Sequence, residues 1–328
     1  MNPSSCPHVD VVVVSYNGKH NLEYSLPSLV GQAYPSFNIF VADNSSTDGT
    51  GEWVRKYHPS VTVMRLAHNE GMSAMNHVLD WPRQGARTDA KYIFVAGWDL
   101  IFDPRCIEHA VKVMEADPGI GMVGFSVLGL LEWVDPGELA KASAALQETA
   151  IKDVTWVPGA CSVIRREVLD LVGFLDPAYF AYCEEDDLQH RFRVLGRRTV
   201  LVNTPVWQNV REASFDTATA AYLAMRNVIR YRLKNFGMKA GLRQILSTVN
   251  QACNPLLKPD ATNRVARRAR PFSVVRNVPI VLKALSWNVL RFPDTLRARR
   301  ELLARLEHAR QLLERRREQA NAGSPGSI

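Results

Sequence analysis

The stretch VDVVVVSYNG, Val9 to Gly18, decides the fold. Its β-branched run is typical of a strand buried on both faces, and the polar Ser-Tyr-Asn-Gly that follows marks a turn. Apolar residues then recur at helical spacing on one face, at Leu22, Leu26, Leu29 and Val30. A strand, a turn and a helix in this order predict the first part of a βαβ unit.

The same rhythm continues to about residue 97. We predict strands over 37–43, 61–66 and 91–97, separated by helices over 51–57 and 70–81. Right-handed crossovers make such a sheet mainly parallel, so the residues that follow the strands meet at one edge, where ligands bind. Those residues are Ser15, Tyr16, Asn17, Asp43, Asn44, Ser45, Asn69, Glu70, Trp98 and Asp99.

The rest of the chain adds strands and helices to this framework. We predict strands over 119–128 and 197–208, a strand–turn–strand–helix run over 154–176, and a helix beginning near Glu184. The expected fold class is α/β, a Rossmann-like, mainly parallel mixed sheet with flanking helices. A basic helical extension follows it, so the expected domains are 1–235 and 236–328.

Composition narrows the class of protein. The chain has 328 residues, 46% of them hydrophobic, which is enough for a full core. Its five scattered cysteines never form a C-x-x-C pair, which argues against a disulfide framework and a zinc site. No secretory signal and no run of about 18 uncharged apolar residues is evident. A cytoplasmic location is therefore expected.

Charge is unevenly distributed along the chain. The formal net charge is +7, but residues 226–328 hold 22 Lys and Arg against 6 Asp and Glu. The first 225 residues hold 18 against 27. An acidic body with a basic tail indicates binding or catalysis in the first part and attraction to an anionic surface in the second.

Seven segments together resemble a known family. They are VVVVSYNG, VADNSSTDGT, NEGMSAMN, GWD, VPGACSVIRREV, YFAYCEEDDLQHRFRVLG and NTPVWQNVREAS. In this order and spacing, over about residues 9 to 235, they resemble the family 2 glycosyltransferases of GT-A fold, specifically the bacterial rhamnosyltransferase-like branch. The resemblance implies inverting transfer of a sugar from a nucleotide-diphosphate donor, such as deoxythymidine-diphosphate-rhamnose, to a saccharide or lipid-linked saccharide acceptor.

The resemblance also assigns binding residues. Those implied for the nucleotide sugar are Ser15, Tyr16, Asn17, Asp43, Asn44, Asn69, Ser73, Asn76, Trp98 and Asp99, and those implied on the acceptor side are Trp156, Gly159, Ala160, Asp187 and Arg191. Physically, Asp43 at a strand end can accept from a base N–H or a ribose hydroxyl. Turn formation and helix capping are the competing explanations for the short polar residues.

The metal motif of the family is incomplete in this chain. Gly97 and Trp98 occupy its first two positions, which leaves Asp99, and Gln208 falls where the family often has a His. Asp99 and Gln208 with the diphosphate are the expected ligands of Mg²⁺ or Mn²⁺. The two departures also keep open a metal-independent enzyme or a catalytically silent nucleotide-sugar-binding homologue.

The run CEEDD, 183–187, concentrates four carboxylates at a predicted helix start. The macrodipole alone would favour acids there. The resemblance implies that Glu185 is the general base, with Glu184 beside it. Asp187 and Arg191 are spaced as an i,i+4 pair that orients the segment. Asp186 is expected to be a simple N-terminal charge.

The basic tail has two explanations. Its apolar stripe, Leu302, Leu306, Ala309 and Leu313, fits a helix packed on the body. Trp287, Leu290 and Phe292 among cations fit an interfacial anchor at anionic lipid, which would place the protein peripherally at the inner face of the cell membrane. A membrane-surface scaffold protein is a further alternative. No nucleic-acid-binding motif accompanies the charge, so we expect no nucleic-acid partner.

Overall fold

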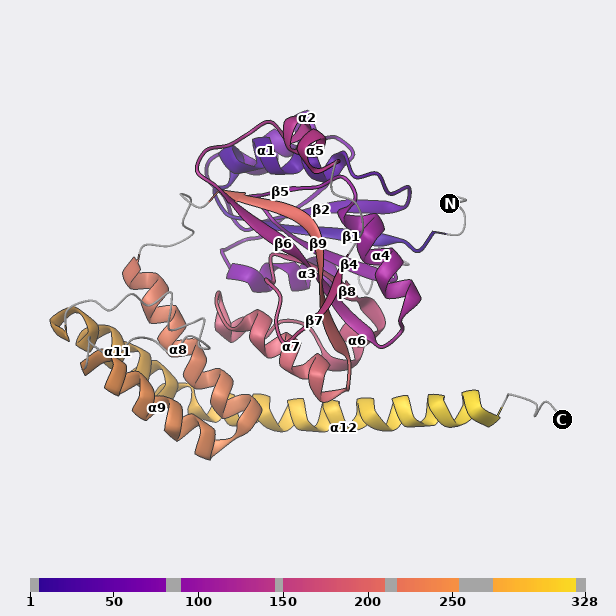
Figure 1. Cartoon of the computed structure of the whole chain (residues 1–328). Coiled ribbons are helices and arrows are strands. Elements are labelled where there is room, and N and C mark those ends of the chain that lie inside the picture. The colour runs from indigo at the N-terminus through magenta and orange to yellow at the C-terminus, as the bar shows by residue number, and fades with distance from the viewer. Residues whose placement is uncertain (1–5, 81–89, 145–149, 210–216, 254–273, 323–328) are drawn as a thin grey trace. The chain divides into compact units, whose positions relative to one another are not determined.

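A computed structural model describes the chain at residues 6–80, 90–144, 150–209, 217–253 and 274–322 (Figure 1). Its internal contacts divide the chain into two compact units. The first comprises residues up to 180 together with 196–213, and the second comprises 181–195 together with 214 onward. The division of the chain at residue 235 into a catalytic domain and a helical region stays a prediction.

Nine strands of the described residues form the sheet of the first unit, in the order β3-β2-β1-β4-β8-β6-β9-β5, with β7 paired to β9. They are β1 (Val9–Ser15), β2 (Phe37–Asp43), β3 (Thr62–Arg65), β4 (Tyr92–Gly97), β5 (Leu100–Phe102), β6 (Ile120–Leu130), β7 (Ile151–Val154), β8 (Cys161–Arg165) and β9 (Arg198–Asn209). The pairs β1–β2, β1–β4, β2–β3 and β6–β9 are parallel. The predicted mainly parallel mixed α/β sheet is confirmed.

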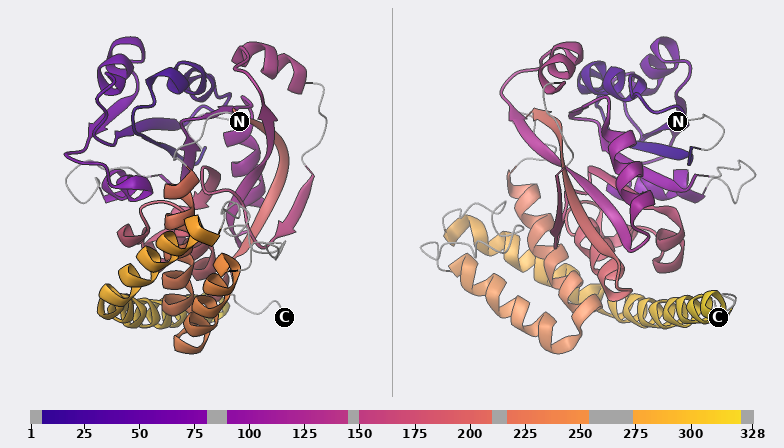
Figure 2. Two further views of the ribbon diagram at one scale, coloured as in Figure 1. Left: turned by 90° about the vertical axis from the view of Figure 1, so that its left-hand side faces the viewer. Right: turned by 45° about the vertical axis from the view of Figure 1, so that its right-hand side comes forward.

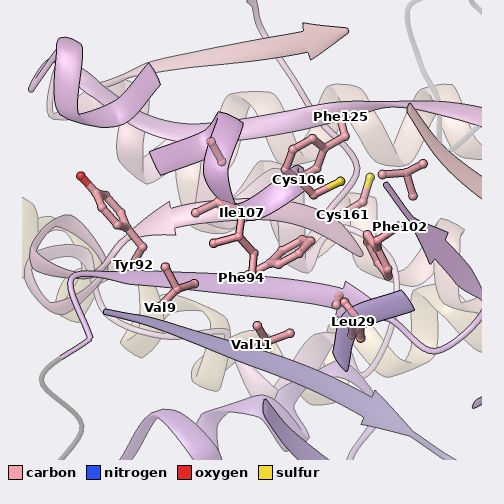
Figure 3. Close-up of a cluster of buried hydrophobic side chains, with 14 of the residues drawn as sticks. Val9, Val11, Leu29, Tyr92, Phe94, Phe102, Cys106, Ile107, Phe125 and Cys161 are labelled. Atoms are coloured by element: carbon pink, nitrogen blue, oxygen red, sulfur yellow. The ribbon is translucent and has the colours of Figure 1, made fainter. Parts of the chain in front are cut away.

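Helices cover both faces of this sheet; Figure 1 places α1 and α2 on one face and α3 and α6 on the other. They are α1 (Lys19–Val30), α2 (Thr50–Tyr57), η2 (Gly71–Ala74), α3 (Met75–Asp80), α4 (Cys106–Ala116), α5 (Pro136–Ser143), α6 (Arg166–Val172) and η4 (Pro177–Tyr179). Alternate strand residues such as Val9, Val11 and Phe94 face α1 and α4, and form a closed apolar core with Leu29 and Ile107 (Figure 3). This core holds the strand ends rigidly.

The predicted helix over 70–81 differs from the observed one at its start. It begins as the 3₁₀ turn η2 and becomes α-helical only at Met75. Gly71 has φ +62°, and a Cβ there would collide with the carbonyl of Phe180, which accepts from the N–H of Met72 at 2.7 Å. Only glycine tolerates both the positive φ and the close approach, so the α-helix starts later than the apolar pattern suggests.

The second unit is helical: α7 (Glu184–Val194), α8 (Thr217–Phe236), α9 (Met238–Cys253), α11 (Val274–Leu290) and α12 (Phe292–Ala322). The helices α8, α9 and α11 pack against one another and lie side by side in both views of Figure 2. In α12, Leu302, Leu306 and Ala309 of the expected stripe are buried, and Leu313 is half-buried. Across the described residues, no helix combines the length and hydropathy of a membrane span.

Candidate active site

The carboxyl edge of the sheet brings the predicted strand-end residues together. In the parallel register Ser15 lies opposite Asp43, Val14 opposite Gly97, and Asp43 opposite Arg65. Ser15, Asp43 and Asn44 are buried, whereas Tyr16 and Asn17 are exposed. The prediction that these strand ends share one edge is therefore confirmed, and their binding roles stay predictions.

Asp43 has one carboxylate oxygen committed to the fold and one without a hydrogen bond. Its Oδ1 accepts from the N–H of Ser46 at 2.9 Å. Its Oδ2 is buried without a hydrogen-bond partner, and Arg65 Nη1 lies 3.6 Å away. A Cβ on Gly51 would lie 2.6 Å from Oδ2, so this glycine leaves space beside the oxygen. A buried acceptor with room beside it fits recognition of a ligand N–H or O–H.

Asn17 fastens the first turn to the loop after β2. Its φ of +50° is in the left-handed region, which asparagine tolerates. Its Oδ1 accepts from the N–H of Thr47 at 2.8 Å, and its own N–H donates to Ser46 Oγ at 2.9 Å. Asn17 therefore holds the turn after β1 and the loop after β2 together at the carboxyl edge of the sheet.

The side chains of Trp98 and Ser15 both lie close to Gly18. A Cβ on this glycine would collide with Ser15 Oγ and would approach the Trp98 ring to 3.1 Å. Ser15 Oγ is buried without a hydrogen-bond partner. The missing side chain at position 18 thus allows the β1 turn to pack against the indole that follows β4.

Asn44 and Asn69 bind each other. Asn44 Nδ2 donates to Asn69 Oδ1 at 2.8 Å and to the carbonyl of Gly71 at 3.0 Å. Asn44 Oδ1 accepts from the N–H of Glu70 at 2.8 Å. These amides fix the loop before η2 against the end of β2, which orders the edge.

Two further predicted residues make local hydrogen bonds. Ser73 Oγ donates to the carbonyl of Glu70 at 2.7 Å. Asn76 exchanges two hydrogen bonds with the backbone of Leu175, at 2.8 and 3.1 Å. Ser73 therefore caps the turn at Glu70, and Asn76 holds the backbone of Leu175. Contact of either residue with a nucleotide sugar stays a prediction.

Asp99 and Gln208, the predicted metal pair, are in contact. Gln208 Nε2 donates to Asp99 Oδ2 at 2.9 Å, because the β5–β9 pairing sets Gln208 opposite Leu100. A Cβ at Gly97 would lie 2.9 Å from Asp99 Oδ1, so glycine makes room for the carboxylate. Within the described part of the chain, no group of three or more His, Cys, Asp or Glu is suited to a metal. The Asp99 carboxylate fits a hard cation that diphosphate oxygens also hold, whereas Gln208 turns its Nε2 toward that carboxylate, so a ligand role for Gln208 stays a prediction.

The predicted acceptor segment lies beside the end of β4. The carbonyl of Ala160 accepts from the N–H of Gly97 at 2.6 Å. The carbonyl of Gly159 accepts from Ser162 Oγ at 3.2 Å, and Trp156 is half-buried. Backbone pairing thus places Gly159 and Ala160 next to Gly97 and the turn that carries Asp99.

In the second unit, a strained turn precedes α7. Tyr182 and Cys183 both have φ of 69°, a costly conformation for side chains of this size. Asn227 of α8, fully buried, donates its two amide hydrogens to the carbonyls of Ala181 and Tyr182 at 2.7 and 2.8 Å. This turn determines where Glu184 and Glu185 begin the helix.

Glu184 and Glu185 each carry a buried Oε2 without a hydrogen-bond partner. Burial raises the pKa of the Glu184 carboxyl well above its usual range, and the Glu185 charge and the hydrogen bond between the two carboxyls raise it further. Glu184 therefore keeps its proton to higher pH than a free glutamate. A buried carboxyl with a raised pKa next to a second carboxyl is typical of acid–base sites.

The raised pKa of Glu184 predicts a pH-dependent stability. Between the unfolded value of about 4.3 and the higher folded value, the folded state binds more protons, so the free energy of unfolding falls as pH rises. We expect Glu184→Gln to flatten this fall, because glutamine cannot ionise. Urea titrations of both proteins from pH 4 upward measure it. Asp186→Asn is the control, and a native-like slope in Glu184→Gln would contradict the assignment.

Asp187 is the buried centre of an ion-pair cluster. Arg191 Nη2 lies 3.1 Å and Lys234 Nζ 3.0 Å from its Oδ2, and Asn235 Nδ2 donates to its Oδ1 at 2.8 Å. The predicted Asp187–Arg191 pair is therefore present, and it is joined by two residues of α8. Asp186 is only partly buried.

Sequence reasoning missed the supporting face of α8. Arg226, Asn227, Arg230 and Lys234 are all buried there. Arg226 and Asn227 are adjacent, Arg230 follows them after four and three residues, and Lys234 follows Arg230 after four, which puts all of them on one side of a helix. The sequence shows this polar stripe. It does not show that the stripe is buried, because that depends on acceptors and counter-ions such as Asp187 on another helix.

A family model described as glycosyl transferase family 2 matches residues 10–173. Among curated relatives, N-acetylglucosaminyl-diphospho-decaprenol L-rhamnosyltransferase of Mycobacterium tuberculosis is 25% identical over 252 residues, which are 67% of this chain and 82% of that protein. The low-salt glycan biosynthesis hexosyltransferase Agl10 of Haloferax volcanii is 23% identical over 243 residues, 67% of this chain and 73% of that protein.

Solved structures show the same fold. Mannosyltransferase PcManGT from Pyrobaculum calidifontis, in complex with GDP-Man and Mn²⁺, aligns with a TM-score of 0.53 at 18% identity, over 94% of this chain and 88% of that one. TarS 1–349 of S. aureus in complex with UDP-GlcNAc aligns with a TM-score of 0.53 at 16% identity, over 94% of this chain and 92% of that one. At such low sequence identities, the similarity shows a common fold and nothing about the ligand or activity of this chain.

Proposed function

The chain belongs to glycosyl transferase family 2, and from that premise we propose that it moves a sugar, with inversion, from a nucleotide-diphosphate donor to a saccharide or lipid-linked saccharide acceptor. The observation that carries the proposal is the buried Oε2 of Glu185, which has no hydrogen-bond partner and lies beside a Glu184 carboxyl whose pKa is raised by burial. Similarity to an L-rhamnosyltransferase acting on a decaprenol-linked sugar favours deoxythymidine-diphosphate-rhamnose and a lipid-linked acceptor.

The proposed mechanism is a single displacement. Glu185 removes the proton of an acceptor hydroxyl as its oxygen attacks the anomeric carbon, and the bond from that carbon to the diphosphate oxygen breaks. The raised pKa of Glu184 disfavours a second negative charge next to the base. Asp43 Oδ2 is the acceptor proposed for a hydrogen bond from the nucleotide.

Asp99, positioned by Gln208, would hold Mg²⁺ or Mn²⁺ together with the donor diphosphate. A bound divalent cation stabilises negative charge on a departing diphosphate. The contribution of the chain is one carboxylate, Asp99, held in place by the Gln208 amide. Because the protein supplies so few oxygens, the metal and the nucleotide should bind together rather than separately.

A catalytically silent nucleotide-sugar-binding homologue is the second candidate. Gly97 and Gln208, which replace acidic or imidazole ligands of the family motif, favour it. Such a protein would bind the donor without consuming it. Release of labelled nucleotide diphosphate from a panel of nucleotide sugars tests the two candidates, because sustained turnover excludes the silent one.

A thermal-shift series tests the donor class and the metal. We expect a nucleotide diphosphate to raise the melting temperature more with Mn²⁺ than with EDTA, since ligands that bind the native state stabilise it. Asp99→Ala should lose the Mn²⁺-dependent part and weaken nucleotide affinity about 10-fold or more. Glu138→Ala, which removes an exposed carboxylate of α5, is the control. An equal shift in EDTA would remove the metal role from Asp99.

A further inference from the structure

Two helices of the second unit expose large apolar side chains. On α9, Leu242 is 53% and Leu246 70% exposed, and Met238 precedes them on the same face. On α11, Val289 is 72% exposed, and Val278 and Leu282 are exposed as well. Contiguous exposed apolar surface is rare on a soluble protein and marks a binding surface.

Each set forms a stripe. At about 100° per residue, Met238, Leu242 and Leu246 fall within about a quarter of the circumference of α9. The opposite side of the helix is buried at Gly241, Gln244 and Thr248. In α11 the exposed Val278, Leu282 and Val289 are spaced by four and seven residues, which also puts them on one face, and Val281, Ala284 and Asn288 on another face are buried. We call these residues of α9 and α11 the apolar stripes.

Charge identifies what the stripes fit. Neither α9 nor α11 contains an Asp or Glu. Lys239 and Arg243 are exposed on α9, next to its apolar stripe in helical rotation. Lys283 is exposed on α11, with its Nζ over the ring of Tyr222 at 4.5 Å. An apolar stripe flanked by cations and free of acids is complementary to an interface of acyl chains and anionic headgroups.

We propose that the apolar stripes of α9 and α11 dock the protein on an anionic membrane surface, with Leu242 and Leu246 entering the interface. This rests on the proposed function, because a lipid-linked acceptor is presented at such a surface. Of the three residues expected from the sequence as an anchor, Leu290 is 80% exposed, whereas Phe292 is half-buried and Trp287 stacks with the Arg226 guanidinium at 4.4 Å. The apolar stripes add Leu242 and Leu246, which the sequence did not indicate.

A second copy of the chain is a poorer occupant. In a two-fold symmetric contact the same face meets itself, so Lys239 and Arg243 would face a second pair of cations. With no acid on α9 or α11 to pair them, such a contact would be repulsive. An anionic bilayer neutralises the same charges.

Co-sedimentation with vesicles tests the proposal. The full chain is spun at about 0.15 M salt with vesicles of phosphatidylglycerol and phosphatidylcholine, and with phosphatidylcholine alone. We expect binding to the anionic vesicles and an affinity at least about 10-fold lower for L242E/L246E. Because both leucines are exposed, the variant should keep native circular dichroism.

Leu303→Glu is the matched control, since Leu303 of α12 is 49% exposed and lies outside the stripes. It should bind vesicles like the native chain. Absence of binding to anionic vesicles, or equal binding by L242E/L246E, overturns the proposal. The proposal is also overturned if light scattering shows that the native chain is a dimer and L242E/L246E a monomer, and neither binds vesicles. Nucleotide binding measured without vesicles reports on the proposed function separately.

Discussion

Replacing Glu185 by glutamine is expected to lower kcat for sugar transfer by about 10² to 10⁴-fold, the usual contribution of a general base. Glutamine keeps the size of the side chain and cannot accept the acceptor proton. The strained turn and the Asn227 hydrogen bonds that place the residue remain intact. Donor binding should therefore change little, and steady-state transfer with a thermal shift of bound nucleotide measures both.

Asp186→Asn is the matched control for this experiment. It removes one carboxylate from the same helical turn, so it reproduces the change in local charge. We expect it to retain most of the native kcat. Native turnover by Glu185→Gln, or an equal loss in Asp186→Asn, would show that Glu185 is not the base.

Replacing Asp187 by alanine is expected to destabilise the second unit by about 3–5 kcal/mol, because it leaves buried charges without their counter-ion. Arg191 and Lys234 both contact this carboxylate, and their side chains are only 3% and 7% exposed. Asn235 loses its acceptor as well. Denaturant unfolding followed by circular dichroism measures the loss.

Two further variants separate the cost of leaving buried cations without a counter-ion from the cost of removing any carboxylate. Asp294→Ala removes the acid of an exposed pair in the same unit, 3.0 Å from Arg291, and should cost at most about 1 kcal/mol. Adding Lys234→Met to Asp187→Ala removes a stranded cation and should recover part of the stability. Equal losses for Asp187→Ala and Asp294→Ala would contradict a buried cluster.

Most of the fold could be predicted from local pattern. The β-branched run of β1 and the βαβ rhythm are encoded in neighbouring residues, so the parallel pairing of the first strands and their shared carboxyl edge follow from the handedness of crossovers. The start of α3 could not be predicted, because it depends on how Gly71 meets the carbonyl of Phe180, more than 100 residues away.

The candidate site divides in the same way. Residue type and position at strand ends indicated Asp43 and Asp99, and helical spacing indicated the Asp187–Arg191 pair. The hydrogen bond from Gln208 to Asp99 depends on the pairing of β5 with β9, which the sequence did not predict. Likewise, Asn227 holds the turn before Glu184, and Lys234 pairs with Asp187. Both residues belong to α8, and the sequence alone does not predict that α8 packs against α7.

By itself the sequence determined the fold class, the edge that carries the strand-end residues, and the helix that begins at CEEDD, because each depends on periodicity and on residues close in the chain. Only the tertiary structure decided which acids of that run are distinguished. Glu184 is set apart by burial beside Glu185, and Asp187 by the cations of α8. Burial and distant charge fix a carboxyl group's protonation and energy, and both arise only when separate segments pack.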